Sequence, residues 1–154
     1  MSAICGLIQL DKSPNAARRC SIVHAALEPY SRHAQGMWDG LHAAMGSRLT
    51  RLLPEDQHDH QPLQGGNGRF VLVADVRLDN RAELGNKLNI PSARLKHMAD
   101  ADVLLTAYEK WEQQLLDHLL GNFAFAIWDK ERQSLFLARD HMGKRPLFYH
   151  QGNG

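Results

Sequence analysis

Two β-rich runs near the end of the chain, residues 123–128 and 135–138, are separated only by a short polar segment. Aromatic and branched residues at this spacing predict an antiparallel hairpin. A third run, residues 147–149, follows a turn at Gly143 and Pro146 and is expected to add another strand. Because hairpins join antiparallel neighbours and need no helical crossover, this region argues against a doubly wound parallel fold.

Helices and further strands are expected along the rest of the chain. Ser13 and Pro14 predict the start of a helix that ends near Tyr30, with Val23 and Leu27 on its apolar stripe. The other elements that the pattern predicts are strands at 4–10, 38–44, 48–53 and 70–76, helices at 80–88 and 100–111, and a helical turn at 115–120. The first of these strands is rich in apolar residues, which is typical of a strand buried on both faces. Together the elements predict an α+β protein.

The overall composition excludes several classes of protein. A chain of 154 residues is expected to form one domain. Eighteen basic against seventeen acidic residues leave a formal charge of +1, which disfavours nucleic acid as a partner. No apolar run approaches the ~20 residues of a membrane-spanning helix, and the N-terminus lacks a signal-peptide pattern. The sequence therefore predicts a cytoplasmic protein with no membrane partner, whose two cysteines, Cys5 and Cys20, are buried thiols.

The stretch 121–149 carries a long motif, GNFAFAIWD followed by LFLARDHMGKRPLFY, which resembles the N-terminal glutaminase domain of asparagine synthetases. The resemblance extends over residues 1–154. It implies the fold of N-terminal-nucleophile hydrolases, a four-layer αββα sandwich with two mostly antiparallel sheets, in agreement with the pattern above. The ending 151–154 reads as a hairpin turn without its return strand. We therefore expect a fragment that lacks its last strands and a C-terminal synthetase domain.

The resemblance also implies a position for the nucleophile. Family sequences begin Met-Cys-Gly-Ile-x-Gly, and the cysteine attacks the glutamine amide while its own α-amine acts as the base. Aligned without a gap, this run places Ser2 at the position of the nucleophile. Cys5 lies three residues further on and has no free amine, so we interpret it as a core thiol. A serine hydroxyl is much less acidic than a thiol, and it depends more on groups that stabilise the oxyanion.

Those stabilising groups are replaced in this sequence. In the family, an Asn-Gly-Glu signature after the central strand supplies the oxyanion hole and holds the amine of the substrate. Here the three positions are Ala74, Asp75 and Val76. Alanine cannot donate a hydrogen bond, a carboxylate would repel an oxyanion, and valine has no charge for an ammonium group. The sequence therefore predicts weak or absent glutamine hydrolysis.

Other parts of the glutamine pocket are partly retained. Asp100 matches the family carboxylate that contacts the α-ammonium of the ligand, although it is equally well interpreted as a helix N-cap. Either Arg48 or Arg51 matches the arginine that holds the α-carboxylate. Because they lie three residues apart on a predicted strand, at most one can line the pocket, and Arg48 is slightly preferred. Arg32 and His33 match a loop that covers the substrate.

The run from Ala74 to Leu84 resembles a subgroup of the family, the cyclases that form the macrolactam ring of lasso peptides. In that subgroup the amine comes from a precursor peptide, and a C-terminal domain activates a carboxylate with ATP and Mg²⁺. We expect no cofactor in this chain and predict a scaffold or substrate-holding module. The alternative is an active glutaminase that supplies ammonia for asparagine synthesis. A third possibility is hydrolysis of another amide.

The remaining candidate clusters favour structural roles. His58, Asp59 and His60 are adjacent on a loop and rarely converge on one ion in that arrangement, so no metal site is expected. Residues 65–68 precede a strand and predict a turn, and Arg139 with Asp140 predicts a structural pair. The aromatic residues alternate as sheet-core residues do: Phe123, Phe125, Trp128, Phe136 and Phe148.

Overall fold

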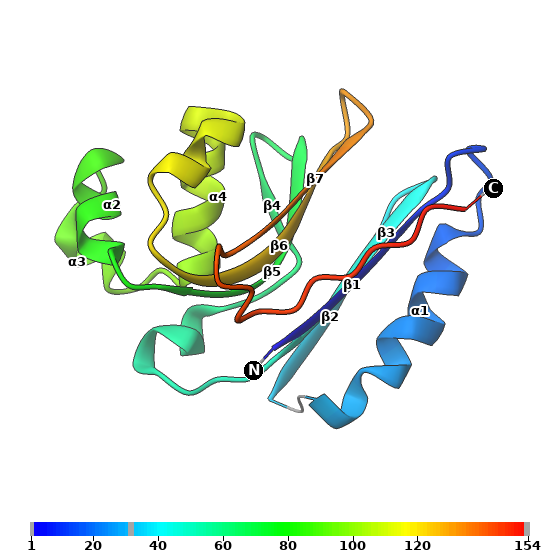
Figure 1. Ribbon diagram of the computed structural model, residues 1–154, viewed down its shortest axis with the longest axis horizontal. Coiled ribbons are helices and arrows are strands. Elements are labelled where there is room, and N and C mark those ends of the chain that lie inside the picture. The colour runs from blue at the N-terminus through cyan, green and yellow to red at the C-terminus, as the bar shows by residue number, and fades with distance from the viewer. Residues whose placement is uncertain (1, 31–32, 153–154) are drawn as a thin grey trace.

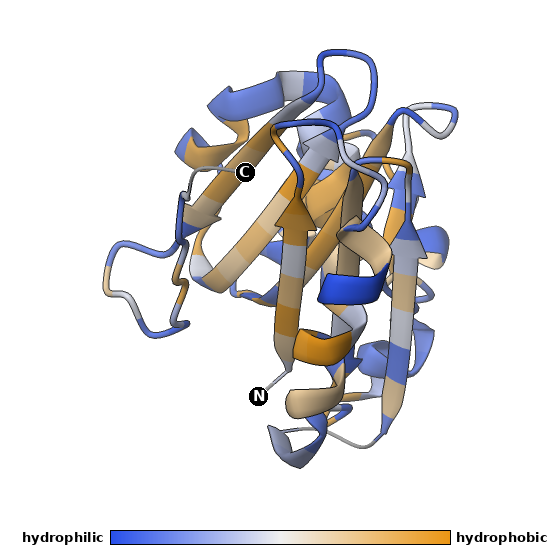
Figure 2. Ribbon diagram, turned by 90° about the vertical axis from the view of Figure 1, so that its right-hand side faces the viewer, coloured by the Kyte–Doolittle hydropathy of each residue, from blue (hydrophilic) through white to orange (hydrophobic). Residues whose placement is uncertain are grey.

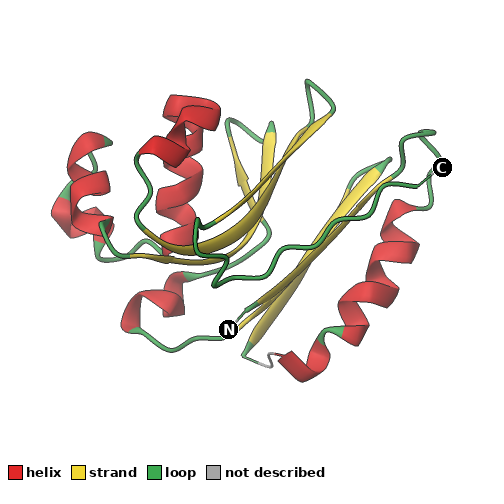
Figure 3. Ribbon diagram, in the orientation of Figure 1, coloured by secondary structure: helices red, strands yellow, loops and turns green. Residues whose placement is uncertain are grey.

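The computed structural model describes residues 2–30 and 33–152. In chain order the elements are β1 (Ala3–Ile8), α1 (Ala16–Ala26), η1 (Glu28–Tyr30), β2 (Ala34–Asp39), β3 (Ala43–Leu49), η2 (Pro54–His58), β4 (Leu63–Gly65), β5 (Phe70–Leu78), α2 (Arg81–Lys87), α3 (Ser92–Leu95), α4 (Asp100–Trp111), η3 (Glu112–Asp117), β6 (Gly121–Asp129) and β7 (Ser134–Arg139), where η marks a short 3₁₀ helix. Helix α1 covers one sheet, and α2, α3 and α4 lie on the far side of the other (Figures 1 and 3). The predicted four-layer α+β sandwich is confirmed.

Both sheets are antiparallel throughout the described residues. The first sheet has the order β1-β3-β2 and the second the order β4-β5-β6-β7. The predicted hairpin is confirmed, because β6 pairs with β7 and its register closes at Asp129 opposite Ser134. The turn predicted at 65–68 also forms, with positive φ angles at Gly66, Asn67 and Gly68. Glycine and asparagine tolerate this backbone region better than other residues do.

Strand β5 is buried on both faces, and its pleat separates two apolar clusters. Leu72, Ala74 and Leu78 pack toward the helical layer that contains α4, in the larger cluster. Val71 and Val73 pack instead between the two sheets, with residues of β3 and β6. Figure 2 shows the apolar colouring concentrated on the strands. The alternation places Asp75 on the side of β5 that faces the first sheet.

The predicted N-terminal elements form with different limits and orientation. Helix α1 begins after Asn15, and its buried residues are Ala16, Cys20 and His24. The predicted stripe is wrong at Val23, which is 47% exposed, because His24 takes the buried position next to Cys20 on the inward face of the helix. Strand β1 is an edge strand whose residues are mostly half-buried, so the expectation of burial on both faces is also wrong.

Two short strands form a hairpin where the sequence pattern predicted shifted ones. Strands β2 and β3 pair along their whole length, from Ala34 opposite Leu49 to Asp39 opposite Ala44. The predicted strand at 38–44 therefore crosses the turn between them. The prediction at 48–53 is also shifted, because β3 ends at Leu49 and the chain then enters η2.

The predicted helix at the second half of the chain is confirmed as α4, but its cap differs. Ala99 is the N-cap residue, and the carboxylate of Asp102 accepts a hydrogen bond from the Ala99 backbone N–H at 2.7 Å. Asp100 is the first helical residue, so its interpretation as the N-cap is wrong. The helical turn predicted at 115–120 forms earlier, as η3.

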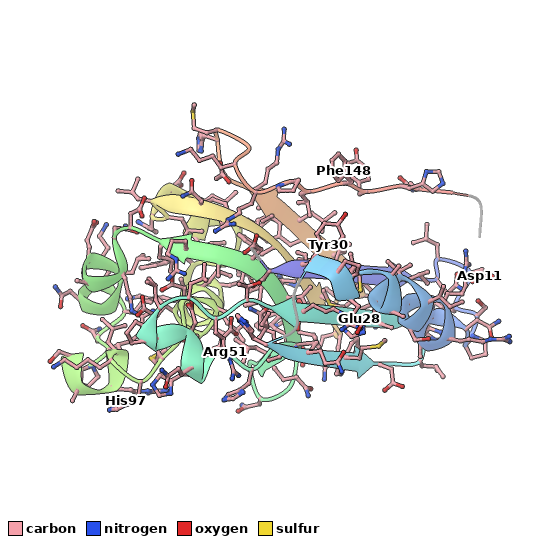
Figure 4. All side chains as sticks on the ribbon, turned by 90° about the horizontal axis from the view of Figure 1, so that it is seen from below. Asp11, Glu28, Tyr30, Arg51, His97 and Phe148 are labelled. Carbon is pink, nitrogen blue, oxygen red and sulfur yellow. The ribbon has the colours of Figure 1, made fainter. Side chains whose placement is uncertain are left out.

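The expected strand at 147–149 does not form among the described residues. After β7 the chain continues without regular structure (Figure 1). Phe148 lies on the outside of this segment and is 91% exposed (Figure 4). Its expected place in a sheet core is therefore wrong, because the segment pairs with no strand that the structure describes. Within those same residues, no helix is long and apolar enough to cross a membrane.

A buried ion pair holds the end of the β5–β6 ladder. Asp129 is 1% exposed and accepts hydrogen bonds from the guanidinium of Arg69, the shortest at 2.5 Å. It also accepts the backbone N–H groups of Glu131 and Arg132, which shape the turn into β7. The Arg69 hydrogen bond lowers the pKa of Asp129 to about 2. This carboxylate therefore stabilises the fold above about pH 4, and its contribution is lost as the pH falls toward 2.

We expect Asp129→Ala to lower the free energy of unfolding by about 2–4 kcal/mol, because it leaves the guanidinium and two N–H groups without their acceptor. Urea denaturation at pH 7 measures this change. Glu131 also pairs with Arg69, but its side chain is 70% exposed. The control Glu131→Gln should therefore change the free energy of unfolding by less than about 0.5 kcal/mol. Equal effects of the two substitutions would contradict the assigned role of Asp129.

Candidate functional site

Ser2 connects the two sheets at the N-terminal end of β1. Its hydroxyl oxygen accepts a hydrogen bond from the Thr50 backbone N–H at 3.1 Å, just after the end of β3 in the first sheet. Its backbone N–H donates to the Asp75 carboxylate at 3.2 Å, on β5 of the second sheet. The residue predicted at the position of the nucleophile therefore lies where both sheets meet, with its nitrogen against a carboxylate.

Asp75 occupies a largely buried position and is compensated by an arginine. It is 8% exposed, and the Arg145 guanidinium lies 3.3 Å from its second oxygen. Burial raises the pKa of Asp75, while Arg145 and the Ser2 N–H oppose that rise. The position predicted to repel an oxyanion thus carries a carboxylate that faces the nitrogen of Ser2.

The neighbours of Asp75 on β5 face the other way. The backbone N–H and C=O of Ala74 both bind the side-chain amide of Gln61, at 2.5 and 3.0 Å. Gln61 thereby continues the hydrogen bonding of the β5 edge beyond the short strand β4. Val76 is half-buried and packs against the larger apolar cluster. Neither side chain supplies a polar group to the space around Ser2.

Asp100 is engaged within the fold. One carboxylate oxygen accepts the Leu78 backbone N–H at 2.9 Å, and the other binds the Arg81 guanidinium at 2.6 Å. Arg81 also donates to the carbonyl oxygens of Leu95 and Met98. Asp100 therefore joins β5 to α2 and the start of α4, and its contact with a substrate ammonium stays a prediction.

The two candidate arginines lie in different places. Arg48 shares a face of β3 with Ala44 and Gly46, and its Nε–H donates to the His24 carbonyl oxygen at 2.9 Å, so it packs against α1. Arg51 lies beyond the end of β3 and donates to the Asp59 carbonyl oxygen at 3.1 Å. The Nε of Arg51 is buried without a hydrogen-bond partner. Binding of a substrate carboxylate by Arg48 stays a prediction.

The predicted covering loop is described only in part. His33 accepts the Arg51 backbone N–H through its Nδ1 at 2.9 Å. Arg32 lies outside the described residues. The pairing predicted for Arg139 with Asp140 stays a prediction, and the Asp140 carboxylate accepts the backbone N–H groups of Phe123, Lys144 and Arg145. This carboxylate fixes the turn that brings Arg145 to Asp75.

Four residues of this region were not identified from the sequence. Arg145, Gln61, Thr50 and Arg81 each bind a predicted site residue or its backbone. One signal was available for Arg145, because a carboxylate on a central strand requires a compensating cation when it is buried. The other three depend on which loops approach β1 and β5, and spacing along the sequence does not encode that approach.

A second polar region surrounds the adjacent histidines. A cavity of about 480 Å³ is lined by side chains that include His58, His60, His97 and Asp102. His58 and His97 contact each other edge to face, with ring centroids 5.4 Å apart. Among the described residues, no three His, Cys, Asp or Glu side chains converge in a way that could hold a metal ion.

Asp59 lies beside this region in an unfavourable environment for a charge. One of its carboxylate oxygens accepts from the Gln61 side chain at 3.0 Å, and the other is buried without a partner. Burial is the main cause that raises the pKa of Asp59 to about 6. The folded state therefore binds more protons than the unfolded state between about pH 4 and 6, so this group lowers stability as the pH rises through that window.

Comparison with known proteins gives a family model that matches the whole chain and relatives that match parts of it. The model of a family described as the glutamine amidotransferase domain matches residues 1–154. Asparagine synthetase [glutamine-hydrolyzing] 3 of Bacillus subtilis is 38% identical over 80 residues, which cover 52% of this chain and 13% of that protein. Asparagine synthetase B [glutamine-hydrolyzing] of Escherichia coli is 32% identical over 124 residues, which cover 76% of this chain and 22% of that protein.

A plant relative extends the match further along the chain. Asparagine synthetase [glutamine-hydrolyzing] 2 of Oryza sativa subsp. japonica is 28% identical over 135 residues, which cover 86% of this chain and 22% of that protein. The aligned part thus spans between 13% and 22% of the length of these three relatives.

We expect Asp59→Asn to raise the free energy of unfolding by about 1–3 kcal/mol at pH 7.5, because it removes a poorly compensated charge. The difference between the two proteins should shrink as the pH falls from about 6 to 4, where Asp59 of the unsubstituted chain becomes protonated in the folded state. Urea denaturation at several pH values measures both curves. Stability curves that run parallel across this window would contradict the proposed burial of a charge.

Proposed function

Because the chain belongs to the glutamine amidotransferase domain family, we propose that it is a degenerate member of that family. In this proposal it serves as the scaffold or substrate-holding domain of an ATP-dependent, amide-forming enzyme similar to asparagine synthetases. The observation that carries the proposal is the contact between Ser2 and Asp75, in which a buried carboxylate binds the nitrogen that would have to act as the base.

The contact disfavours general-base catalysis by the terminus. If Met1 is removed, the Ser2 nitrogen becomes an α-amine, whose ordinary pKa of about 7.7–8.0 allows it to accept a proton at neutral pH. A carboxylate 3.2 Å away favours the charged ammonium form and raises the pKa of that amine. An ammonium group cannot accept the proton of the Ser2 hydroxyl. The nucleophile, already weak as a serine, thus loses its base.

One backbone donor near Ser2 is also engaged within the fold. The Ala74 N–H, which could donate, binds the Gln61 side chain instead. The Asp75 side chain fills the space that the resemblance assigns to a glycine. Removing one oxyanion-hole donor typically slows an enzyme by about 10²–10³-fold. Loss of the base, the thiol and the donors together therefore supports a domain without useful glutaminase activity.

The amide-forming reaction is proposed for a part of the protein beyond this chain. In the macrolactam cyclases that the run 74–84 resembles, the amine comes from the N-terminus of a precursor peptide, so no ammonia is needed. Residues 1–154 would then form a glutaminase-like domain that packs on a C-terminal synthetase domain. That second domain would hold ATP and Mg²⁺, activate a carboxylate and act in the cytoplasm on a precursor peptide.

An active glutaminase is the second candidate. The names of the relatives include glutamine hydrolysis, and the Ser2 hydroxyl accepts the Thr50 N–H, which points at the atom that would attack. In this alternative, Ser2 releases ammonia from glutamine for an asparagine-type synthesis. Ser2 and Asp75 are the residues at which the two functions differ.

Ammonia release from glutamine distinguishes the two candidates. We expect the unsubstituted protein to match the uncatalysed background, and Ser2→Ala to give the same rate. Ser2→Cys should also remain near background, because Asp75 and the engaged Ala74 N–H persist. Intact-mass measurement establishes whether Met1 is removed in each sample. Turnover that Ser2→Ala abolishes would support the active glutaminase and overturn the degenerate role.

The energy-consuming reaction gives a second, independent test. In the full protein, ATP consumption in the presence of its peptide substrate should be unchanged by glutamine and by Ser2→Ala. This follows because the amine that is joined does not come from glutamine in the proposed reaction. Pyrophosphate release measures the rate. Stimulation by glutamine that disappears in Ser2→Ala would show that ammonia from this domain feeds the synthesis.

A further inference from the structure

Two cysteines that the proposed function does not use face each other between β1 and α1. Cys5 lies on β1 and Cys20 on α1, and their sulfur atoms are 3.9 Å apart. Neither forms a disulfide in the structure. A disulfide requires a sulfur–sulfur distance of about 2.05 Å, so the two atoms need to approach by roughly 1.9 Å.

The surroundings of the two thiols are small and apolar. Cys20 clusters with Ala16 and Ala44, and Cys5 packs against this cluster. Gly46 lets β3 approach this site closely, because a Cβ atom there would lie 2.8 Å from the His24 ring and 3.1 Å from the Cys5 sulfur. The two sulfur atoms are in direct contact. Short side chains on a strand and a helix that already pack together leave little else to rearrange when the sulfurs approach.

The two thiols differ in exposure and in the direction in which their contact shifts the pKa. Cys5 is half-buried, whereas Cys20 is 1% exposed. The hydrogen bond between them raises the pKa of Cys5 and lowers the pKa of Cys20. Cys5 is therefore the thiol that an oxidant in solution reaches first. Cys20 is positioned to attack the Cys5 sulfur once that sulfur carries a glutathione.

We propose that Cys5 and Cys20 form a redox-modification site, which a small disulfide such as oxidised glutathione converts into an intramolecular disulfide that links β1 to α1. This proposal does not depend on the function proposed above. It rests on the placement of the two sulfurs, their alanine-lined surroundings and the difference in their exposure.

The reaction proceeds in two exchanges. Cys5 loses its proton to solvent, its sulfur attacks one sulfur of oxidised glutathione, and one glutathione thiolate leaves. Cys20 then gives up its proton to solvent or to that thiolate, attacks the Cys5 sulfur of the mixed disulfide, and releases the second glutathione. Two protein thiols are thus oxidised to one disulfide, while one oxidised glutathione is reduced to two molecules of glutathione.

Peptide mapping of the full protein after exposure to glutathione buffers tests the proposal. Trypsin releases Cys5 in a peptide that ends at Lys12 and Cys20 in the peptide 20–32. We expect the two peptides to appear joined, with a mass two hydrogen atoms below their sum, and to separate after reduction. The joined species should increase as the ratio of oxidised to reduced glutathione increases.

Variants with one thiol provide the matched controls. Cys20→Ser should hold glutathione on Cys5 as a lasting mixed disulfide, because no second thiol displaces it. The double variant Cys20→Ser, Val23→Cys keeps two thiols but moves one to a residue that is 47% exposed, away from the buried face of α1. It should give no joined peptide at dilutions that prevent links between molecules.

Three outcomes would contradict the proposal, the first of them in the unsubstituted protein alone. A lasting mixed disulfide on Cys5 with Cys20 still free would overturn the proposal. Two thiols that stay free in a buffer that modifies Cys5 of the Cys20→Ser variant would also overturn it. Joined peptides of equal yield from the Val23→Cys double variant would show that the link does not depend on the observed placement, and would overturn it as well.

Discussion

Successive residues of β5 face opposite layers of the protein, and this alternation determines which groups meet. Leu72 and Ala74 complete the apolar layer under α4, while Val71 and Val73 fill the space between the sheets. The strand is hydrogen-bonded to β6 along its full length, and a slip of its register by one residue would exchange the two sets of side chains between the two layers. Asp75 follows this alternation and is thereby directed toward Ser2.

Placing a carboxylate in that position has consequences for the groups around it. A buried charge requires compensation, and the structure supplies Arg145 and the Ser2 N–H. Asp140 holds the turn that positions Arg145, so a residue that is remote from Ser2 stabilises its surroundings. The same contacts that make Asp75 tolerable inside the protein occupy the nitrogen of Ser2. The contacts that compensate the buried carboxylate are therefore the same ones on which the proposed loss of a catalytic base rests.

The sequence-based predictions were accurate where neighbouring residues along the chain determine an element, and less accurate where the element depends on residues distant in the sequence. The hairpin of β6 and β7 and the strand β5 were predicted because branched and aromatic residues dominate them locally. Helix α1 was predicted with the wrong face, because its apolar stripe is weak and a buried histidine, His24, replaces a hydrophobic residue. The strand expected at 147–149 is absent from the described residues, since strand formation needs a neighbour as well as propensity.

The sequence by itself determined the antiparallel α+β class, because that class depends on local patterns of residue type, and it determined that Ser2, Ala74, Asp75 and Val76 occupy their positions. Only the tertiary structure decided that Asp75 binds the Ser2 nitrogen and Arg145, and that Asp100 binds Arg81 instead of capping its helix. It also decided that the sulfurs of Cys5 and Cys20 lie 3.9 Å apart. These contacts join residues from different layers, and the layers come together through burial of apolar surface, which has no direction and leaves no spacing signal in the sequence.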